Sequence, residues 1–204
     1  MNYIFDFDGT LADSLEAFIA VFNKEVRGNK DPLTADEIQI LRHMSSRKAL
    51  RSLGIRWWHI PRLIAKGLPE FHALVPSFNS FKNLPETLRA LQARGDKLFI
   101  VTSNTKSSVD LFLNLHNMSN CFIDMDTASG PFKKAKHIRG LMKKHGLKRR
   151  ESVYIGDETR DIVAGRLAGV KTVAVTWGFS DASVLKKRRP TYLINEPSEL
   201  IAFH

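Results

Sequence analysis

The sequence predicts an α/β protein with a doubly wound parallel sheet and a small all-helical insert. Three observations support this: short apolar runs recur along the chain, helical patterns separate them, and one segment near the N-terminus has helical patterns only. Apolar runs without alternation are typical of strands buried on both faces. Strands that alternate with helices indicate βαβ units, whose right-handed crossovers place the carboxyl ends of the strands along one edge. Open α/β sheets bind their ligands at this edge.

The strands of the sheet are expected at five apolar runs. They are residues 3–7, 98–102, 153–156, 172–176 and 192–194, and Phe122-Ile123 is a candidate for a short additional strand. Helices are expected between them: one runs from Pro85 to a stop at Gly95, and two apolar stripes over 135–142 and 162–167 each end at a glycine. Glycine favours helix termination because it adopts the left-handed conformation at low cost.

Residues 14–81 interrupt this alternation. An apolar stripe over 15–26 predicts one helix, and Thr34-Ala-Asp-Glu37 is a capping box that opens a second. No segment here is a convincing strand, and Trp57 and Trp58 are expected to pack among the helices. The sequence thus predicts a core domain of residues 1–13 and 82–204 and a helical cap domain of residues 14–81.

The composition argues against several classes of protein. No apolar run is long enough to span a membrane, and the N-terminus lacks the features of a signal peptide, so a cytoplasmic location without a membrane partner is expected. Cys121 is the only cysteine, which fits a reducing compartment. The net charge is +10, but the basic runs are separate and lie near expected helix ends. Solvated helix ends explain them better than a nucleic-acid-binding surface.

Two acids follow the first expected strand. In Asp6-Phe-Asp8-Gly-Thr-Leu11, Asp6 and Asp8 lie two residues apart, so an extended backbone points both side chains the same way. Like charges beside an apolar strand are costly unless a cation or a shared proton compensates them. A solvated turn with incidental acids would not explain why the neighbouring residues are so apolar.

Three further polar clusters follow expected strands or begin expected helices. Thr102-Ser103-Asn104 offers hydroxyls, an amide and backbone N–H groups to a phosphate, although ordinary helix caps have the same pattern. Lys133 and Lys134 oppose the dipole at the start of a helix, and either a bound anion or plain solvation would explain them. Gly156-Asp157-Glu-Thr-Arg-Asp161 supplies carboxylates of the kind that bind Mg²⁺, and Asp161 is equally explained as a first-turn helix acid.

Taken in chain order, these four pieces resemble the haloacid dehalogenase (HAD) superfamily. The pieces are Asp-x-Asp-Gly-Thr-Leu, a threonine after a strand, a lysine, and Gly-Asp-x-x-x-Asp, and together they span nearly the whole chain. The helical insert after the first motif resembles the C1-type cap of the superfamily. Asp6-Phe-Asp-Gly-Thr-Leu-Ala-Asp-Ser14 is similar to the phosphoglycolate phosphatase-like group. The resemblance implies a Rossmann-like core and a Mg²⁺-dependent phosphatase.

The resemblance also implies a role for each matching residue. Asp6 attacks phosphorus to form an aspartyl-phosphate, and Asp8 protonates the leaving group and then activates water. Mg²⁺ is held by the carboxylates of Asp6 and Asp157 and the backbone carbonyl of Asp8, with Asp161 close by. Thr102 and the conserved lysine hold the phosphoryl oxygens. The further candidates for substrate binding are Gly9, Thr10, Ser103, Asn104, Arg42 and Arg47.

Three assignments within this set involve a choice between alternatives. Phe132-Lys-Lys-Ala135 matches the Phe-Gly-Lys pattern of the family best if Lys134 binds the phosphate, which leaves Lys133 where a glycine is common. The register of the strand favours Thr102 over Ser103. Arg42 and Arg47 lie in a polar cluster with His43 and Ser46, which could meet a carboxylate or a second phosphate of the substrate or form a solvated turn.

The expected activity is hydrolysis of a small phosphorylated metabolite similar to phosphoglycolate or a sugar phosphate. Asp8 excludes a dehalogenase, because that branch lacks the second aspartate. A phosphomutase shares every core residue and stays an alternative. A nucleic-acid-binding protein on a phosphatase fold is supported by the charge alone, and the complete set of acids disfavours a catalytically dead subunit. The sequence does not indicate an oligomeric state.

Overall fold

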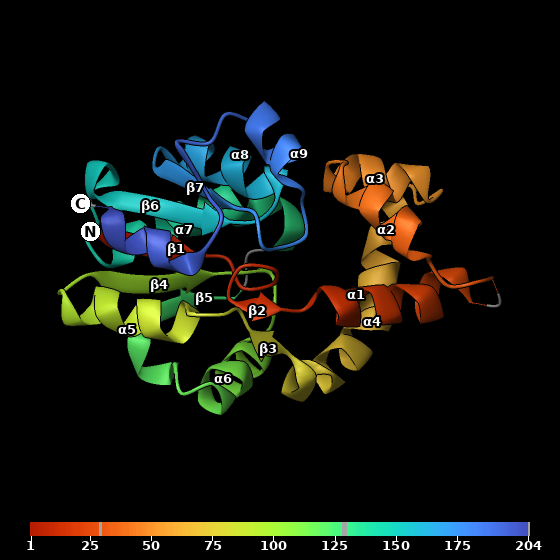
Figure 1. The fold of residues 1–204 in the computed structure, drawn as a ribbon, viewed down its shortest axis with the longest axis horizontal. Coiled ribbons are helices and arrows are strands. Elements are labelled where there is room, and N and C mark those ends of the chain that lie inside the picture. Colours follow the sequence, from red (N-terminus) through yellow and green to blue (C-terminus); the bar gives the residue numbers. More distant parts are fainter. Residues whose placement is uncertain (29, 128–129, 204) are drawn as a thin grey trace.

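The computed structural model describes residues 1–28, 30–127 and 130–203, and a six-stranded sheet lies at the centre of its larger part (Figure 1). The strands are β1 (Asn2–Phe5), β4 (Lys97–Val101), β5 (Asp124–Asp126), β6 (Ser152–Gly156), β7 (Lys171–Val175) and β8 (Tyr192–Ile194). Their order is β5-β4-β1-β6-β7-β8, and every neighbouring pair is parallel. The predicted α/β class is confirmed.

The winding direction of the chain reverses at β1. From this central strand the chain passes outward to β4 and β5, and then returns to β6, β7 and β8 on the other side. Ile4 is therefore paired with Phe99 on one side and with Tyr154 on the other. Such a reversal leaves a crevice at the carboxyl ends of the two strands, which is where doubly wound sheets bind ligands.

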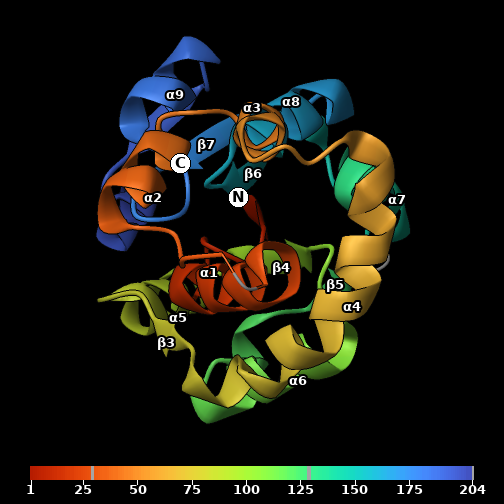
Figure 2. The same cartoon turned by 90° about the vertical axis from the view of Figure 1, so that its right-hand side faces the viewer.

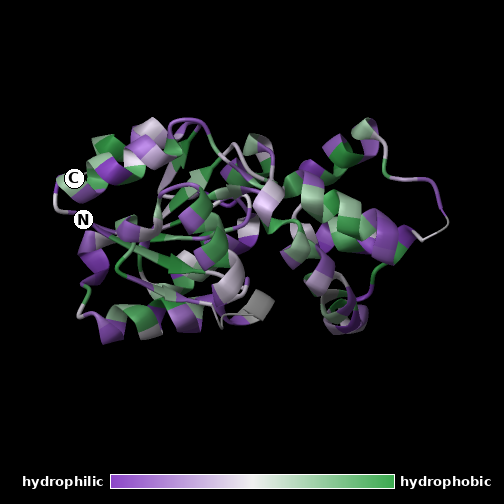
Figure 3. Ribbon diagram, turned by 90° about the horizontal axis from the view of Figure 1, so that it is seen from below, coloured by the Kyte–Doolittle hydropathy of each residue, from purple (hydrophilic) through white to green (hydrophobic). Residues whose placement is uncertain are grey.

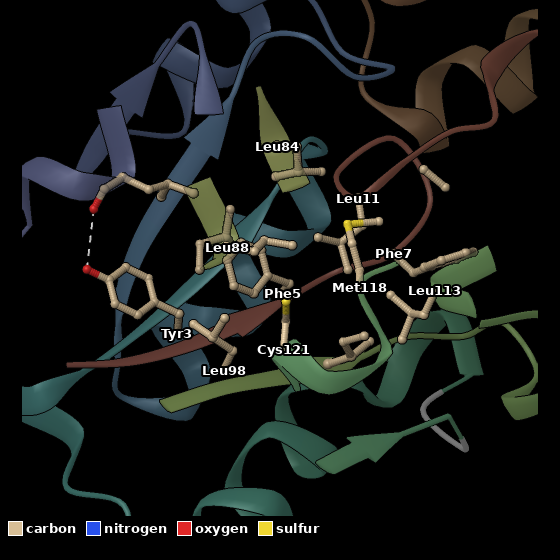
Figure 4. Close-up of a cluster of buried hydrophobic side chains, with 14 of the residues drawn as sticks. Tyr3, Phe5, Phe7, Leu11, Leu84, Leu88, Leu98, Leu113, Met118 and Cys121 are labelled. Atoms are coloured by element: carbon tan, nitrogen blue, oxygen red, sulfur yellow. Dashed lines mark hydrogen bonds between the residues drawn. The ribbon is translucent and has the colours of Figure 1, made fainter. Parts of the chain in front are cut away.

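Each central strand buries side chains on both faces, as the apolar runs predict. Tyr3 and Phe5 point into one core cluster, which α5 (Leu84–Ala93) and α6 (Lys106–Leu115) complete (Figure 4). Ile4, between them, joins the opposite cluster with α7 (Gly130–Lys144) and α8 (Thr159–Ala168). The strands are accordingly mostly hydrophobic, whereas the covering helices mix hydrophobic and hydrophilic positions (Figure 3). The short helix α9 (Ala182–Lys187) precedes β8.

The helical insert lies beside the carboxyl ends of the strands (Figures 1 and 2). Its helices are α1 (Leu15–Phe22), which continues as a π-helical turn over Asn23–Arg27, α2 (Ala35–Arg42), α3 (Ser46–Ser52) and α4 (Ile60–Ala73). The predicted capping box is confirmed: Thr34 Oγ1 accepts from Glu37 N, and the Glu37 carboxylate accepts from Thr34 N at 2.8 Å. The 3₁₀ segments are Trp57–His59, Val75–Ser77, Ser119–Cys121, Arg149–Glu151 and Pro197–Ala202.

The structure corrects two predictions about strands. The additional strand is Asp124–Asp126 and not 122–123, because Ile123 is 56% exposed and the ladder with β4 begins only at Asp124. The expectation that the insert contains no strand is also wrong, since β2 (Ala12–Asp13) and β3 (Asn79–Ser80) form an antiparallel pair. This pair lies where the chain leaves the core and returns to it, next to the predicted domain boundaries. The domain division itself stays a prediction.

Two predictions about packing also need correction. Leu167 is 66% exposed, so the apolar stripe over 162–167 does not face the core as a whole, and α8 packs through Ile162 and two small alanines instead. Trp58 is 50% exposed and does not fill the interior of the insert. The side chain of Trp57 lies outside the described part of the structure. None of the helices in the described residues combines the length and the apolarity needed to cross a membrane.

Candidate active site

Three acids meet at the crevice beside β1 and β6. Asp6 follows β1 directly, and its backbone N–H donates to Ile155 O of β6 at 2.8 Å. Asp157 follows β6, and Asp161 lies in the first turn of α8. All three are buried, and one carboxylate oxygen from each lies within 4.8 Å of the other two. Buried oxygen donors at this spacing fit Mg²⁺, which is bound in proteins by a few carboxylates.

Lys134 supplies a positive charge to this acidic cluster. It is buried, and its Nζ lies 2.5 Å from Asp6 Oδ2 and 2.7 Å from Asp161 Oδ1. Burial lowers the pKa of Lys134, but the charges of Asp161 and Asp6 outweigh it, so the net shift of this pKa is upward. Lys133, the other candidate, is exposed to solvent. The geometry therefore favours Lys134 as the cation of the site.

Asp6 and Asp157 are harder to ionise than free carboxylates. Burial raises the pKa of Asp6 to about 7, and the charge of Lys134 opposes this rise. Burial also raises the pKa of Asp157 well above its ordinary value, with a further upward contribution from the charges of Glu158 and Asp161. A divalent cation would reverse both shifts, because it favours the ionised carboxylates that bind it.

Asp8 is held apart from this cluster. Its Oδ1 accepts from Ser14 Oγ at 3.1 Å, and both of its carboxylate oxygens accept from Asn104 Nδ2, at 3.3 and 3.2 Å. Burial raises the pKa of Asp8, and the hydrogen bonds from Ser14 and Asn104 offset part of the rise. A half-buried carboxyl with a raised pKa and a fixed orientation is suited to give and take a proton. Asn104 N also donates to Thr102 Oγ1 at 3.0 Å, which leaves the hydroxyl proton of Thr102 available for a ligand.

Gly9 and Thr10 lie against the carboxylate of Asp157. Thr10 Oγ1 donates to Asp157 Oδ1 at 3.0 Å, and the backbone N–H of Phe179 donates to Asp157 Oδ2 at 2.8 Å. Gly9 adopts φ +70°, and a Cβ at this position would lie 2.3 Å from Asp157 Oδ2. Only glycine allows the turn after β1 to approach the carboxylate so closely.

The polar cluster of the insert faces the core. Arg42 donates to Gly178 O at 2.9 Å and to Phe179 O at 3.3 Å, and Ser46 Oγ donates to Glu158 Oε2. The guanidinium of Arg42 is therefore engaged by backbone carbonyls of the core. The side chains of Arg47 and Ser103 are exposed, and neither makes a hydrogen bond to the three acids among the described residues. Substrate binding by Arg42, Arg47 and Ser103 stays a prediction.

Four contributors to the site were not assigned from the sequence. Ser14 positions Asp8, the backbone of Phe179 positions Asp157, and Glu158 and Arg160 pair with each other at 2.8 Å. Glu158 and Arg160 lie inside the fourth motif, and a basic residue among acids in the sequence could have indicated that they pair. The contribution of Phe179 is made through its backbone, so no residue type could have indicated it.

The fold and the site define a hydrolase with an α/β core and a helical cap. Residues 3–175 match the haloacid dehalogenase-like hydrolase family, and the chain belongs to this family. The chain is 32% identical over 199 residues to a phosphoglycolate phosphatase of Synechococcus elongatus, which covers 97% of this chain and 94% of the relative. It is 30% identical over 125 residues to the pyrophosphatase PpaX of Bacillus pumilus, covering 60% of this chain and 58% of that one.

Solved structures share the fold over the full length. A haloacid dehalogenase-like family hydrolase from Streptococcus pneumoniae superposes with a TM-score of 0.80 at 22% identity, covering 98% of this chain and 96% of the other. A hydrolase from Pseudomonas syringae gives a TM-score of 0.76 at 23% identity, with coverages of 98% and 96%. At these identities the likeness supports the fold alone.

Proposed function

We propose that the protein is a Mg²⁺-dependent phosphatase that hydrolyses a small phosphorylated metabolite through an aspartyl-phosphate on Asp6. The observation that carries this proposal is the environment of Asp6: a buried carboxylate directly after β1, 2.5 Å from Lys134 and grouped with Asp157 and Asp161. The relatives named phosphoglycolate phosphatase and pyrophosphatase support the same reaction class.

The first half of the reaction uses Asp6 and Asp8 in different roles. A carboxylate oxygen of Asp6 forms a bond to phosphorus, and the bond from phosphorus to the leaving oxygen breaks with its electron pair on that oxygen. Asp8 gives its proton to the same oxygen, which the raised pKa of this carboxyl favours. The products of this half are the free alcohol and the phosphorylated Asp6.

The second half restores the enzyme. Asp8, now ionised, takes a proton from a water molecule, and the oxygen of that water bonds to phosphorus. The bond from phosphorus to Asp6 breaks, and inorganic phosphate leaves. Ser14 and Asn104 hold Asp8 in one orientation through both halves, so the group that gave the proton is placed to take one back.

The phosphoryl group needs positive charge and donors around it. Lys134 Nζ and the hydroxyl of Thr102 would hold its oxygens, and Asp6, Asp157 and Asp161 would hold Mg²⁺. When bound, the metal neutralises the charge that builds up on the transferring group. The insert covers the crevice through its contacts with Glu158 and with residues 178–179, which favours a small substrate similar to phosphoglycolate or a sugar phosphate.

Hydrolysis of p-nitrophenyl phosphate at neutral pH tests the proposal. The wild-type protein should release nitrophenol and inorganic phosphate only when Mg²⁺ is present and without any phosphorylated cofactor, which also separates a phosphatase from a phosphomutase. Asp6→Asn keeps the shape of the side chain but removes the nucleophile, so its rate should fall at least ~10³-fold. A folded Asp6→Asn variant with wild-type activity would overturn the proposed mechanism.

A further inference from the structure

Arg160 is a cation beside the nucleophile that the reaction above does not use. It is the second residue of α8 and lies next to Asp161 in the chain. Its positive charge lowers the pKa of Asp6 and of Asp8, against the larger upward effect of burial. The guanidinium therefore lies within electrostatic reach of both catalytic acids.

Only some of the hydrogen-bond donors of this guanidinium have an acceptor among the described residues. Within the described residues its one hydrogen bond runs from Nη2 to Glu158 Oε1 at 2.8 Å, while Nε is buried and has no acceptor. A buried N–H without a partner costs about 1–3 kcal/mol, and native proteins rarely leave such a group unexplained. The Arg160 side chain as a whole is nevertheless 37% exposed, so part of it faces solvent although Nε is buried.

The position of Arg160 is set by a contact that joins the insert to the core. Glu158 is buried, accepts from Arg160 on one side and accepts from Ser46 of α3 on the other. Arg160 is thereby held at the seam between the core and the insert. Asp6 and Asp157 are buried, and a substrate whose phosphate meets Asp6 would extend toward this seam.

We propose that Arg160 is a specificity-determining residue that binds a second anionic group, a carboxylate or a phosphate, on the leaving-group part of the substrate. The proposal rests on the proposed phosphatase function and narrows its substrates to phosphate esters and anhydrides whose leaving group is itself negatively charged. A guanidinium matches both groups, because its planar fork donates two parallel N–H bonds.

Electrostatics favours this assignment. Five carboxylates, those of Asp6, Asp8, Asp157, Glu158 and Asp161, lie in or beside the crevice and would repel a second anion. Lys134 is already committed to two of them. Arg42 is committed to backbone carbonyls of residues 178–179. Among the described residues the Nε of Arg160 has no acceptor, so this guanidinium keeps a donor that the fold does not use.

A purely structural role for Arg160 makes a different prediction. If the guanidinium only neutralises Glu158, its removal should impair every substrate by the same factor. If it binds the leaving group, its removal should impair charged leaving groups more than neutral ones, mainly through KM. The ratio of kcat/KM between matched substrates therefore separates the two roles.

The test compares three substrates with Mg²⁺ present: phosphoglycolate, pyrophosphate and 2-hydroxyethyl phosphate. The last replaces the carboxylate of phosphoglycolate by a neutral CH₂OH group. A charge-assisted hydrogen bond contributes about 1.5–3 kcal/mol, so Arg160→Gln should lower the preference for a charged over the neutral substrate ~10- to 100-fold. The substrate that loses most, phosphoglycolate or pyrophosphate, identifies the second anion as a carboxylate or a phosphate.

Two variants control for charge and folding. Arg160→Lys keeps the charge without the fork and should recover part of the preference. Lys171→Gln removes a positive charge from an exposed residue at the amino end of β7, the opposite edge of the sheet, and should leave the preference as in the wild type. Thermal unfolding of each variant identifies any loss that arises from instability.

The outcomes distinguish this proposal from the proposed function. An unchanged preference in an active Arg160→Gln variant overturns the assignment. A loss of preference in Arg47→Gln but not in Arg160→Gln also overturns it, because the second anion would then bind to the insert. A wild-type protein that prefers 2-hydroxyethyl phosphate refutes the substrate class and leaves the phosphatase intact. Failure to hydrolyse any of the three substrates or p-nitrophenyl phosphate overturns the proposed function itself.

Discussion

Lys134→Met removes a buried cation and leaves an unbranched apolar side chain that is one heavy atom shorter. Lys134 Nζ contacts Asp6 at 2.5 Å and Asp161 at 2.7 Å. The variant leaves two buried carboxylates without this partner, so both folding and activity should suffer. Lys133 stands next to it in the chain and is exposed, which makes Lys133→Met a matched control for the loss of one positive charge.

The size of the effect follows from the two contacts. At an effective dielectric constant of about 20, an ion pair at these distances gains about 6 kcal/mol before the cost of desolvation is subtracted. Desolvation costs several kcal/mol per ion, and removal of one partner from a buried pair typically destabilises a protein by about 3–5 kcal/mol. For a chain of this size, that corresponds to a fall in Tm of about 6–20 °C. Loss of a donor to the phosphoryl group should also lower kcat by about 10²- to 10³-fold.

Thermal unfolding and kinetics on p-nitrophenyl phosphate measure both effects. Lys133→Met should stay within about 0.5 kcal/mol of the wild type, because surface substitutions rarely exceed this value. Equal losses in the two variants, or a larger loss in Lys133→Met, would refute the assignment of Lys134 and the burial argument behind it.

Two further predictions concern the acidic cluster. Because burial raises the pKa of Asp6 to about 7 and also raises that of Asp157, the folded metal-free protein binds these protons better than the unfolded chain does. The free energy of unfolding in EDTA should therefore fall as the pH rises from about 4 to 7. The gain in Tm on adding Mg²⁺ should be larger at pH 8 than at pH 5. An equal gain in Tm at both pH values would contradict this prediction. Gly9→Ala should lose Mg²⁺ affinity and about 1–3 kcal/mol or more of stability, because φ is +70° and the new Cβ meets Asp157. Gly95 has φ +87° and open space around it, so Gly95→Ala measures the cost of the backbone strain alone. Equal Mg²⁺ affinity in the two variants would show that the contact with Asp157 does not affect metal binding.

The order of strands and helices could be predicted because local patterns determine it. The run Tyr3–Phe7 is apolar at every position except Asp6, which is the pattern of a strand covered on both faces, and the structure buries both faces as expected. The capping box at Thr34 is a four-residue signal and could be identified directly. The predicted strand at 122–123 was wrong because two apolar residues do not determine where a strand pairs. The ladder with β4 determines that, and it begins at Asp124.

The candidate site was predictable only in part. The chain order of the motifs indicated Asp6, Asp8, Asp157, Asp161, Thr102 and a lysine, since parallel strands bring their carboxyl ends together. Which of two adjacent lysines enters the cluster depends on the rotation of α7 against the sheet, which no local pattern reveals. Lys134 lies 128 residues from Asp6 in the chain, and only the packing of the helix places one lysine in the crevice and the other in solvent.

The sequence by itself determined the fold class, the edge of the sheet that carries the site and the acids that gather there, because these depend on periodicity and on the chain order of strands and motifs. The tertiary structure decided which polar side chains already have hydrogen-bond partners within the protein. The sequence shows Arg42 in a polar cluster and Arg160 inside an acidic motif, but it does not show what either guanidinium contacts. In the folded chain Arg42 donates to the carbonyls of Gly178 and Phe179, while the buried Nε of Arg160 has no acceptor among the described residues. Hydrogen-bond satisfaction depends on long-range packing, so only the folded structure can assign it.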